Sequence, residues 1–351
     1  MNNEHLLTLG WDIGGAHLKA ALVDGNGRAL RVFQLSCPLW RGLQYLEQTV
    51  AQVLAELGMV DVRHAITMTG ELADIFLSRA TGVEQITQTM VRCLESHEMV
   101  VYAGRAGFVS QVDAGQRVAD IASANWHASA AFLADAAGDA LFVDIGSTTS
   151  DFAVLGQGRV QALGYSDAER LRCEELVYTG VVRTPVMAVA QRVPFAGAWQ
   201  RLAAEHFATT ADIYRLTGEL DEACDMAETA DGAEKSLQAS ARRLARMVGC
   251  DLQDAAMLRW RELALVLRSR QLATLQDAAE RHLSRGLLAQ DAPFIGAGAG
   301  RFLVRALAGR MGRDYRDATE FIAAAPEVAP WAGVCLPACA VARLAQGTQP
   351  C

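Results

Sequence analysis

The chain of 351 residues predicts an α/β protein with two domains, each built on the same strand module. Two apolar runs end in the same acidic, glycine-containing turn, at Asp12–Gly15 and at Asp144–Thr149. After each turn the pattern continues as strand, tight turn and strand, which is an internal duplication of topology. A third apolar run ends in the glycine-rich segment Gly296–Gly300. We therefore expect two domains that face a central cleft and bind one phosphorylated ligand there.

The first half is expected to alternate short strands with amphipathic helices. Strands are predicted from alternating or continuous apolar runs, and helices from apolar residues at helical spacing. The predicted strands are Leu6–Leu9, Leu18–Val23, Ala29–Gln34, Arg63–Thr69 and short strands around Val100 and Phe108. The predicted helices are Leu43–Leu57, which stops at Gly58, then Glu71–Arg79, Val83–His97 and one apolar helix over Ala119–Ala134.

The second half restarts the module with strands at 140–145, 151–155 and 159–163. Helices are expected to dominate residues 199–290, including a long charged helix at about 254–285. A strand over Ala292–Ile295 leads to Gly296–Gly300, a helix from Arg301 and a last helix at 329–345. The expected domains are 1–135, 136–328 with a helical insertion at about 199–290, and a C-terminal helix in 329–351 that packs back on the first domain.

Composition narrows the class of protein. Half of the residues are hydrophobic (51%) and 21% are charged, as in a globular chain. The formal net charge of −8 argues against a nucleic-acid partner, which would need a basic surface. No apolar run approaches the roughly 18–20 residues of a membrane helix, and no basic N-terminal region precedes an apolar core. We expect a cytoplasmic protein without a membrane partner, and a homo-oligomer is left open.

The eight cysteines are scattered and form no CxxC pair, so we expect reduced thiols that are mostly buried. Cys335 and Cys339 lie one helical turn apart near the end of the chain. A packed helix face explains this pair better than a metal site, because no nearby histidine completes a ligand set.

Each half of the chain begins with a strand, an acidic loop and a second strand, and glycines precede a late helix. In this arrangement the chain resembles the acetate kinase, sugar kinase, Hsp70 and actin superfamily, which has a ribonuclease H-like fold. A narrower resemblance rests on motifs that span nearly the whole chain. These motifs are Trp11–Lys19, Thr69–Leu72, Ser123–His127, Asp144–Asp151, Glu175–Gly180 with Arg183–Pro185, Thr229–Gly232 and Arg243–Arg246. Through them the chain resembles the hydantoinase A/oxoprolinase-related family and, within it, the compact proteins linked to tetrahydromethanopterin-dependent one-carbon transfer.

This resemblance implies a transferase of methanofuran or methylofuran biosynthesis. Such an enzyme condenses an aminomethylfuran-methyl diphosphate with a phenolic γ-glutamyl acceptor of tyramine or tyrosine type, and it releases pyrophosphate. Mg²⁺ is the implied cofactor, and ATP is not required. Two alternatives stay open on the same fold: an ATP-dependent small-molecule kinase or hydantoinase-type amidohydrolase, and a nucleotide-binding switch or assembly protein like actin or Hsp70.

The chemistry of that reaction points to residues in the two turns. Backbone N–H groups in glycine-containing loops can bind a departing diphosphate. The predicted diphosphate-binding residues are Gly14, Gly15, Gly146, Ser147, Thr148 and Thr149, and the predicted Mg²⁺ ligands are Asp12, Asp144 and Asp151. Lys19 is a candidate point charge for a phosphate oxygen unless its strand turns it away. His17 is a candidate base for the phenol proton, the alternative being a structural histidine.

One departure from the kinases concerns the residues after the first turn. A threonine or serine often follows there and offers a hydroxyl to a phosphate, whereas this chain has Ala16 and His17. This weakens the kinase interpretation and favours a ligand bound by the backbone.

Further residues are candidates for substrate binding, each with a structural alternative. Asn125, Trp126 and His127, expected in mid-helix, would contact the furan or phenol, or else form a buried tryptophan with an exposed histidine. Glu71 is a candidate ligand of the substrate amine, or else it opens a helix, and Arg183 is a candidate partner of a carboxylate or phosphate. Asp231 is a candidate cleft residue, or else part of an ordinary turn. Gly296 and Gly298 are candidates for lining a ligand pocket, or else they allow close packing of helix and strand.

Overall fold

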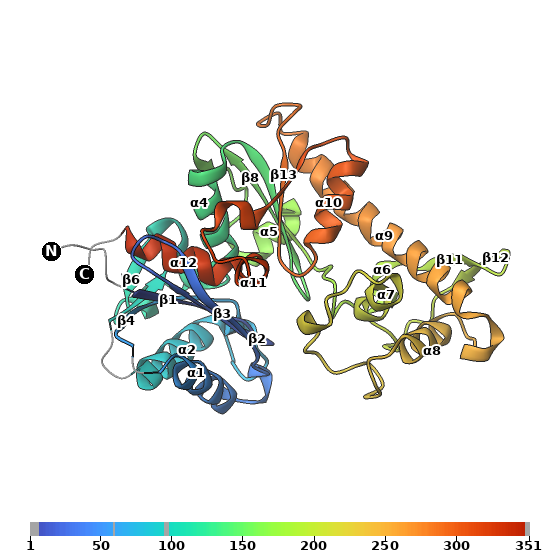
Figure 1. Ribbon diagram of the computed structural model, residues 1–351, viewed down its shortest axis with the longest axis horizontal. Coiled ribbons are helices and arrows are strands. Elements are labelled where there is room, and N and C mark those ends of the chain that lie inside the picture. Colours follow the sequence, from blue (N-terminus) through green and yellow to red (C-terminus); the bar gives the residue numbers. More distant parts are fainter. Residues whose placement is uncertain (1–6, 59, 95–97, 348–351) are drawn as a thin grey trace. The chain divides into compact units, whose positions relative to one another are not determined.

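The computed structural model describes residues 7–58, 60–94 and 98–347. Leu6, His97 and residue 351, where the sequence analysis places boundaries, lie outside the described residues. The chain forms two compact units. Figure 1 shows its helices and strands coloured by position in the sequence. Unit 1 comprises the described residues of Met1–Asp139, Leu155–Cys173 and Asp317–Cys351, and unit 2 comprises Ala140–Val154 and Glu174–Arg316.

Unit 1 is built on a six-stranded sheet in the order β3-β2-β1-β4-β5-β6. Its strands are β1 (Leu7–Ile13), β2 (His17–Val23), β3 (Ala29–Ser36), β4 (Val62–Met68), β5 (Met99–Tyr102) and β6 (Phe108–Ser110). β1 pairs with β2 in antiparallel and with β4 in parallel orientation. Because the carboxyl ends of parallel strands lie at one edge of a sheet, the residues after β1 and β4 are brought together.

The two faces of this sheet are covered by different helices (Figure 1). Leu9, Trp11 and Ile13 of β1 share a buried apolar cluster with α1 (Leu43–Leu57) and α2 (Arg79–Leu94). The opposite face packs against α12 (Leu336–Gln346) and α4 (Asn125–Ala137). Side chains alternate along a strand, so Asp12 points to the face covered by α4 and α12.

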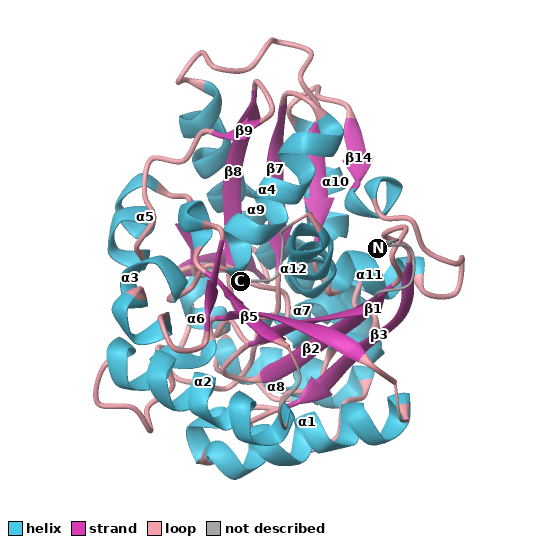
Figure 2. Cartoon of the chain, turned by 90° about the vertical axis from the view of Figure 1, so that its left-hand side faces the viewer, coloured by secondary structure: helices cyan, strands magenta, loops and turns pink. Residues whose placement is uncertain are grey.

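Unit 2 contains most of a second sheet, in the order β10-β8-β7-β13-β14 with β9 paired to β8. The strands are β7 (Ala140–Ile145), β8 (Ser150–Gly156), β9 (Arg159–Val160), β10 (Leu176–Val177), β13 (Phe294–Ala297) and β14 (Tyr315–Asp317). β13 pairs with β7 in parallel orientation, and α10 (Arg301–Arg310) packs against both strands (Figure 2).

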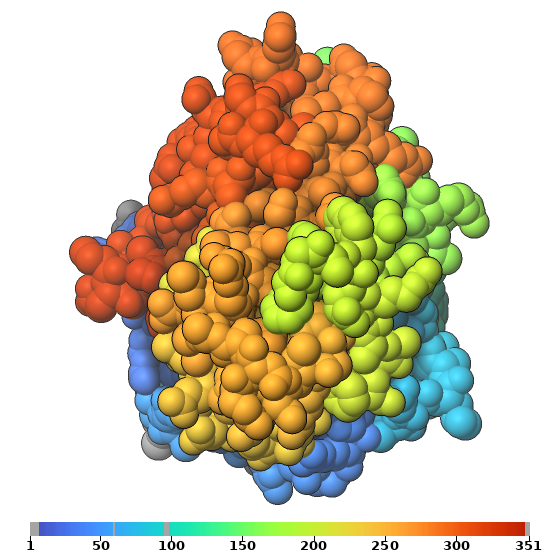
Figure 3. Space-filling view, turned by 90° about the vertical axis from the view of Figure 1, so that its right-hand side faces the viewer, coloured from blue at the N-terminus to red at the C-terminus, as the bar shows by residue number. Residues whose placement is uncertain are grey.

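A helical region completes unit 2. Its helices are α6 (Val186–Val189), α7 (Thr210–Thr217), α8 (Leu237–Met247) and α9 (Met257–Leu283). A two-stranded hairpin, β11 (Arg192–Phe195) with β12 (Ala198–Arg201), lies beside α9, where the yellow-green and orange surfaces meet in Figure 3. The ring of Phe195 stacks on Trp260 of α9 at 5.3 Å between centroids, which fastens the hairpin to the helix.

Several predicted elements are wrong. The helix predicted over Glu71–Arg79 is a short 3₁₀ helix (Gly70–Leu72), and α2 begins only at Arg79, because Ser78 caps it by accepting the N–H of Thr81 at 3.2 Å. The last helix is broken into α11 (Ala329–Val334) and α12, since Pro337 lacks an N–H group in the first turn of α12. The hairpin β11–β12 was not predicted.

The helix predicted over Ala119–Ala134 is also wrong. The structure has α3 (Val118–Ile121) and α4, separated by Ser123 in the left-handed backbone region with φ of 54°. Asn125 is therefore the first residue of α4 rather than a mid-helix residue. Unit 1 also contains α5 (Asp167–Cys173), which lies near this break.

Within the described residues, no helix combines the length and apolar character that crossing a membrane requires.

Candidate functional site

The two acidic turns fold into the same kind of tight hairpin connection. The N–H of Gly14 donates to the carbonyl of His17 at 3.0 Å, and the N–H of Gly146 donates to the carbonyl of Thr149 at 2.9 Å. These two N–H groups are therefore used inside the turns. In the part of the chain that the structure describes, the N–H groups of Ser147 and Thr148 make no backbone hydrogen bond, so they are the better donors for an anion.

In unit 1, three of the predicted residues meet at the end of β1. Lys19 lies opposite Asp12 in the β1–β2 ladder, and its Nζ is 4.0 Å from the Asp12 carboxylate. Asn125 at the start of α4 donates its Nδ2–H to Asp12 Oδ1 at 3.3 Å. Lys19 Nζ also donates to the carbonyl of Val334 at the end of α11 at 3.2 Å. The carboxylate of Asp12 is buried and already has a cationic and an amide partner.

In unit 2 the equivalent positions carry two acids. Asp151 follows Asp144 at the same spacing at which Lys19 follows Asp12, and the strands that hold them, β7 and β8, are paired. Both side chains are only half-buried. The described residues contain no cluster of three His, Cys, Asp or Glu that could hold a metal ion. A carboxylate pair nevertheless fits Mg²⁺, which completes its shell with water and phosphate oxygens.

The turn Asp144–Thr149, called the Asp144 turn below, packs closely against two glycines. A Cβ atom on Gly298 would lie 2.3 Å from Asp144 Oδ1, and Gly298 has φ of +80°. A Cβ atom on Gly180 would lie 2.4 Å from the backbone of Ser147 and Thr148. The N–H of Arg183 donates to the Ser147 carbonyl at 2.8 Å, so the Glu175–Pro185 motif supports the turn from the other side. Unit 2 thus brings Asp144, Ser147, Arg183 and Gly298 together.

Glu71 lies in a buried polar cluster of unit 1. Ser123 Oγ is 2.8 Å from Glu71 Oε1 and 3.2 Å from Asp167 Oδ2. Arg79 pairs with Asp167 at 2.6 Å and lies 4.0 Å from Glu71. Burial, and to a smaller extent the negative Asp167, raise the pKa of Glu71 to about 7, against lowering contributions from Ser123 and Arg79.

This shift predicts a pH dependence of stability. The carboxyl of Glu71 ionises at about 4.5 in the unfolded chain and at about 7 in the folded protein. The folded state therefore binds the extra proton between these values, and its stability falls as the pH rises through this window, by roughly 3 kcal/mol at most. Glutamine does not ionise, so the free energy of unfolding of Glu71→Gln should lack this fall. The difference in free energy of unfolding between the variant and the unmodified protein should therefore shift in favour of the variant from pH 5 to pH 8, as measured by urea denaturation at both values. A stability difference that does not change with pH would contradict this.

Trp126 and His127 are both buried in unit 1, so the structural alternative of a buried tryptophan with an exposed histidine is wrong for the histidine. The guanidinium of Arg170 lies over the Trp126 ring at 3.9 Å from its centroid. His127 Nδ1 is 2.8 Å from the Tyr102 hydroxyl. Burial first, and then the positive charges of Arg105 and Arg170, lower the pKa of His127 to about 4, so its ring is neutral near pH 7.

Asp231 of unit 2 precedes α8 and belongs to an ion-pair cluster with arginines of that helix. Its carboxylate is 3.0 Å from Arg243, 3.4 Å from Arg246 and 3.7 Å from Arg242. Arg243 also pairs with Asp212 of α7 at 2.7 Å, and both side chains are fully buried. These contacts tie the segment before α8 to α7 and α8.

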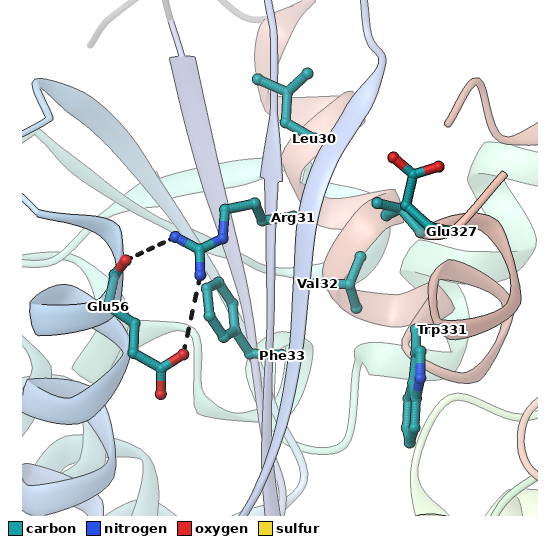
Figure 4. A pocket seen from close by; sticks show the side chains of 8 residues that line it. Leu30, Arg31, Val32, Phe33, Glu56, Glu327 and Trp331 are labelled. Carbon is teal, nitrogen blue, oxygen red and sulfur yellow. Dashed lines mark hydrogen bonds and ion pairs between the residues drawn. The ribbon is translucent and has the colours of Figure 1, made fainter. Parts of the chain in front are cut away.

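A pocket of about 290 Å³ lies elsewhere in unit 1, beside the edge strand β3. In Figure 4, Arg31 reaches back to Glu56, while Glu327 and Trp331 stand on the other side of the strand. None of the predicted site residues lines this pocket.

Three residues that contact or surround Glu71 were not predicted as site residues: Arg79, Ser123 and Asp167. Ser123 opens one of the motifs quoted above, which is a usable signal. Asp167 and Arg79 carry no local signal, because 88 residues separate them and only the fold brings them together.

The family model named hydantoinase/oxoprolinase matches residues 63–346. The chain belongs to the hydantoinase/oxoprolinase family. A curated relative is (4-{4-[2-(gamma-L-glutamylamino)ethyl]phenoxymethyl}furan-2-yl)methanamine synthase of Methanocaldococcus jannaschii, which is 31% identical over 247 residues, covering 70% of this chain and 72% of the relative. The synthase of the same name from Methanococcus vannielii is 31% identical over 114 residues, covering 32% of this chain and 51% of that protein. The predicted family resemblance is confirmed.

Among solved structures, the nucleotide-free acetone carboxylase superposes on this member of the hydantoinase/oxoprolinase family with a TM-score of 0.54. The two chains are 11% identical, and the match covers 88% of this chain and 68% of the carboxylase. At this identity the likeness concerns the fold alone. The expected α/β fold is confirmed, and the curated relatives of this chain are synthases.

Proposed function

We propose that this protein is a transferase that displaces diphosphate from an aminomethylfuran-methyl carbon and joins that carbon to a phenol, forming an aryl ether. The sequence relation to the methanogen synthase supports the reaction class, since the product in its name contains that phenoxymethyl-furan linkage. The observation in the structure that supports it best is the turn Asp144–Thr149, which offers one acid and two backbone donors and is followed by Asp151 on the paired strand β8. The phenolic acceptor is proposed to be a γ-glutamylated tyramine or a tyrosine-type phenol.

The reaction breaks the bond between the furan-methyl carbon and a diphosphate oxygen, and it forms a bond from that carbon to the phenol oxygen. Pyrophosphate leaves with the electron pair, and the phenol loses its proton. In this proposal the N–H groups of Ser147 and Thr148 bind the leaving diphosphate, which stabilises charge as it develops. Asp144 and Asp151 would hold Mg²⁺, whose positive charge would offset the charge of the diphosphate. His17, half-buried at the start of β2, is the proposed acceptor of the phenol proton.

Calorimetry tests the ligand class. The purified protein with Mg²⁺ is titrated with pyrophosphate and, in a separate run, with ATP. We expect micromolar binding of pyrophosphate and no binding of ATP. Tight binding of ATP would favour a kinase-like function instead, and no binding of either compound would remove the physical support for the proposed chemistry.

Substitution of Gly298 tests the support of the Asp144 turn. Gly298→Ala should lower pyrophosphate release about 10²-fold, because the added methyl group displaces the Asp144 carboxylate. Gly286→Ala is the matched control, since Gly286 also has positive φ (+68°) but open space around its Cβ position. Both variants should lose about 1–2 kcal/mol of stability to backbone strain. Gly298→Ala should lose more than this, because its methyl group would also lie 2.3 Å from the carbonyl oxygen of Ile145. Equal activity of the two variants would contradict the role of this contact.

A further inference from the structure

A buried cluster in unit 1 holds two carboxyl groups and one guanidinium. We call Glu71, Arg79, Ser123 and Asp167 the Glu71 cluster. They come from the 3₁₀ helix after β4, the start of α2, the link between α3 and α4, and the start of α5. The Ser123 hydroxyl lies between the carboxylates at 2.8 and 3.2 Å, and it has one hydrogen to donate. The hydroxyl can donate to only one of the two carboxyl groups, and Asp167 Oδ2 already accepts from Arg79 at 2.6 Å.

When both carboxyl groups are ionised, the cluster has two negative charges and one positive charge. Asp167 has its partner in Arg79, at 2.6 Å, whereas Glu71 lies 4.0 Å from the same guanidinium. The side chain of Glu71 has no solvent exposure, and within the described residues its Oε2 has no hydrogen-bond partner. A buried acceptor without a partner costs about 1–3 kcal/mol. The charged groups facing Glu71 are Asp167 from α5 and Arg79 from α2, so either a proton or a cationic ligand completes the cluster.

We propose that the Glu71 cluster binds the primary ammonium group of an aminomethyl substrate. This inference rests on the proposed function, because the name of the relative's product contains a methanamine group. A primary ammonium has three N–H donors, and the oxygens of Glu71, Ser123 and Asp167 are three matching acceptors. A tertiary ammonium has one N–H, and an alcohol carries no charge, so both should bind this cluster more weakly than a primary ammonium.

Arg79 is the charged side chain through which the Glu71 cluster borders on solvent. Its side chain is 34% exposed, compared with 10% for Asp167 and none for Glu71. In this inference the ammonium takes the place of the Arg79 guanidinium beside both acids, so that the two carboxyl groups keep a cationic partner. Glu71 carries a proton below about pH 7, so ammonium binding at pH 6 must release that proton.

Calorimetry with furfurylamine at pH 6 tests this binding, in two amine-free buffers that differ in ionisation enthalpy. We expect binding with release of about one proton, and at least about tenfold weaker binding of furfuryl alcohol and of N,N-dimethylfurfurylamine. Glu71→Gln should weaken furfurylamine binding at least about tenfold and abolish the proton release. Glu84→Gln is the matched control, because Glu84 is an exposed glutamate on α2. Circular dichroism verifies that both variants are folded.

Equal binding of the amine and the alcohol, or unchanged amine binding by folded Glu71→Gln, would overturn the inference. This experiment uses neither a diphosphate nor turnover, so it is independent of the proposed reaction. If instead the protein releases pyrophosphate equally well from donors with and without the aminomethyl group, the ammonium site fails while the proposed reaction stands.

Discussion

Asp144→Asn is expected to abolish turnover, lowering pyrophosphate release by at least about 10²-fold, while the fold stays intact. Asparagine has the same size as aspartate, so it keeps the close packing of residue 144 on Gly298. It removes the negative charge that would hold Mg²⁺ beside the diphosphate. The measurement is pyrophosphate release, with circular dichroism to verify folding.

The control for this variant is Asp277→Asn, which changes an exposed acid on α9 of the same unit and should keep full activity. Near-normal turnover by Asp144→Asn would refute the assignment of the Asp144 turn to the diphosphate. It would leave the fold and the family unaffected, because neither depends on that side chain.

Arg243→Met is expected to cause the largest loss of stability, about 3–5 kcal/mol. Arg243 is fully buried and pairs with Asp212 at 2.7 Å and with Asp231 at 3.0 Å. Its removal leaves the buried carboxylate of Asp212 without its nearest cation. Urea denaturation measures this loss as a lower midpoint.

Arg246→Met is the matched control. Arg246 lies on the same helix and contacts the same Asp231 at 3.4 Å, but its side chain is 44% exposed. Exposed ion pairs contribute less than about 1 kcal/mol, so this variant should unfold near the normal midpoint. Equal destabilisation by the two variants would show that burial of Arg243 does not decide its contribution.

Elements with a strong local signal were predictable from sequence. The helix Leu43–Leu57 and the strand Ala140–Ile145 have the same bounds in the prediction and in the structure. The helix α1 is indicated by apolar residues at helical spacing and by Gly58 at its end, and both signals lie within this one segment. In the strand, a continuous apolar run ends at a glycine turn. Neither requires knowledge of distant parts of the chain.

The break before α4 could not be predicted in this way. Ser123 contacts Glu71 and Asp167, which lie 52 and 44 residues away, and these contacts accompany its left-handed backbone. The local sequence favours a continuous helix, and tertiary contacts override it. The same holds for the site. Asn125 and Asp12 are 113 residues apart in the sequence. The motifs therefore indicated both residues as candidates but did not predict the hydrogen bond between them.

The most direct test of the central claim is an assay of pyrophosphate release from an aminomethylfuran-methyl diphosphate, with and without γ-glutamyltyramine. The proposed function predicts pyrophosphate release that depends on the phenol, with one aryl ether formed for each pyrophosphate and no need for ATP. Pyrophosphate release at the same rate without any phenol, or ether formation only in the presence of ATP, would contradict it.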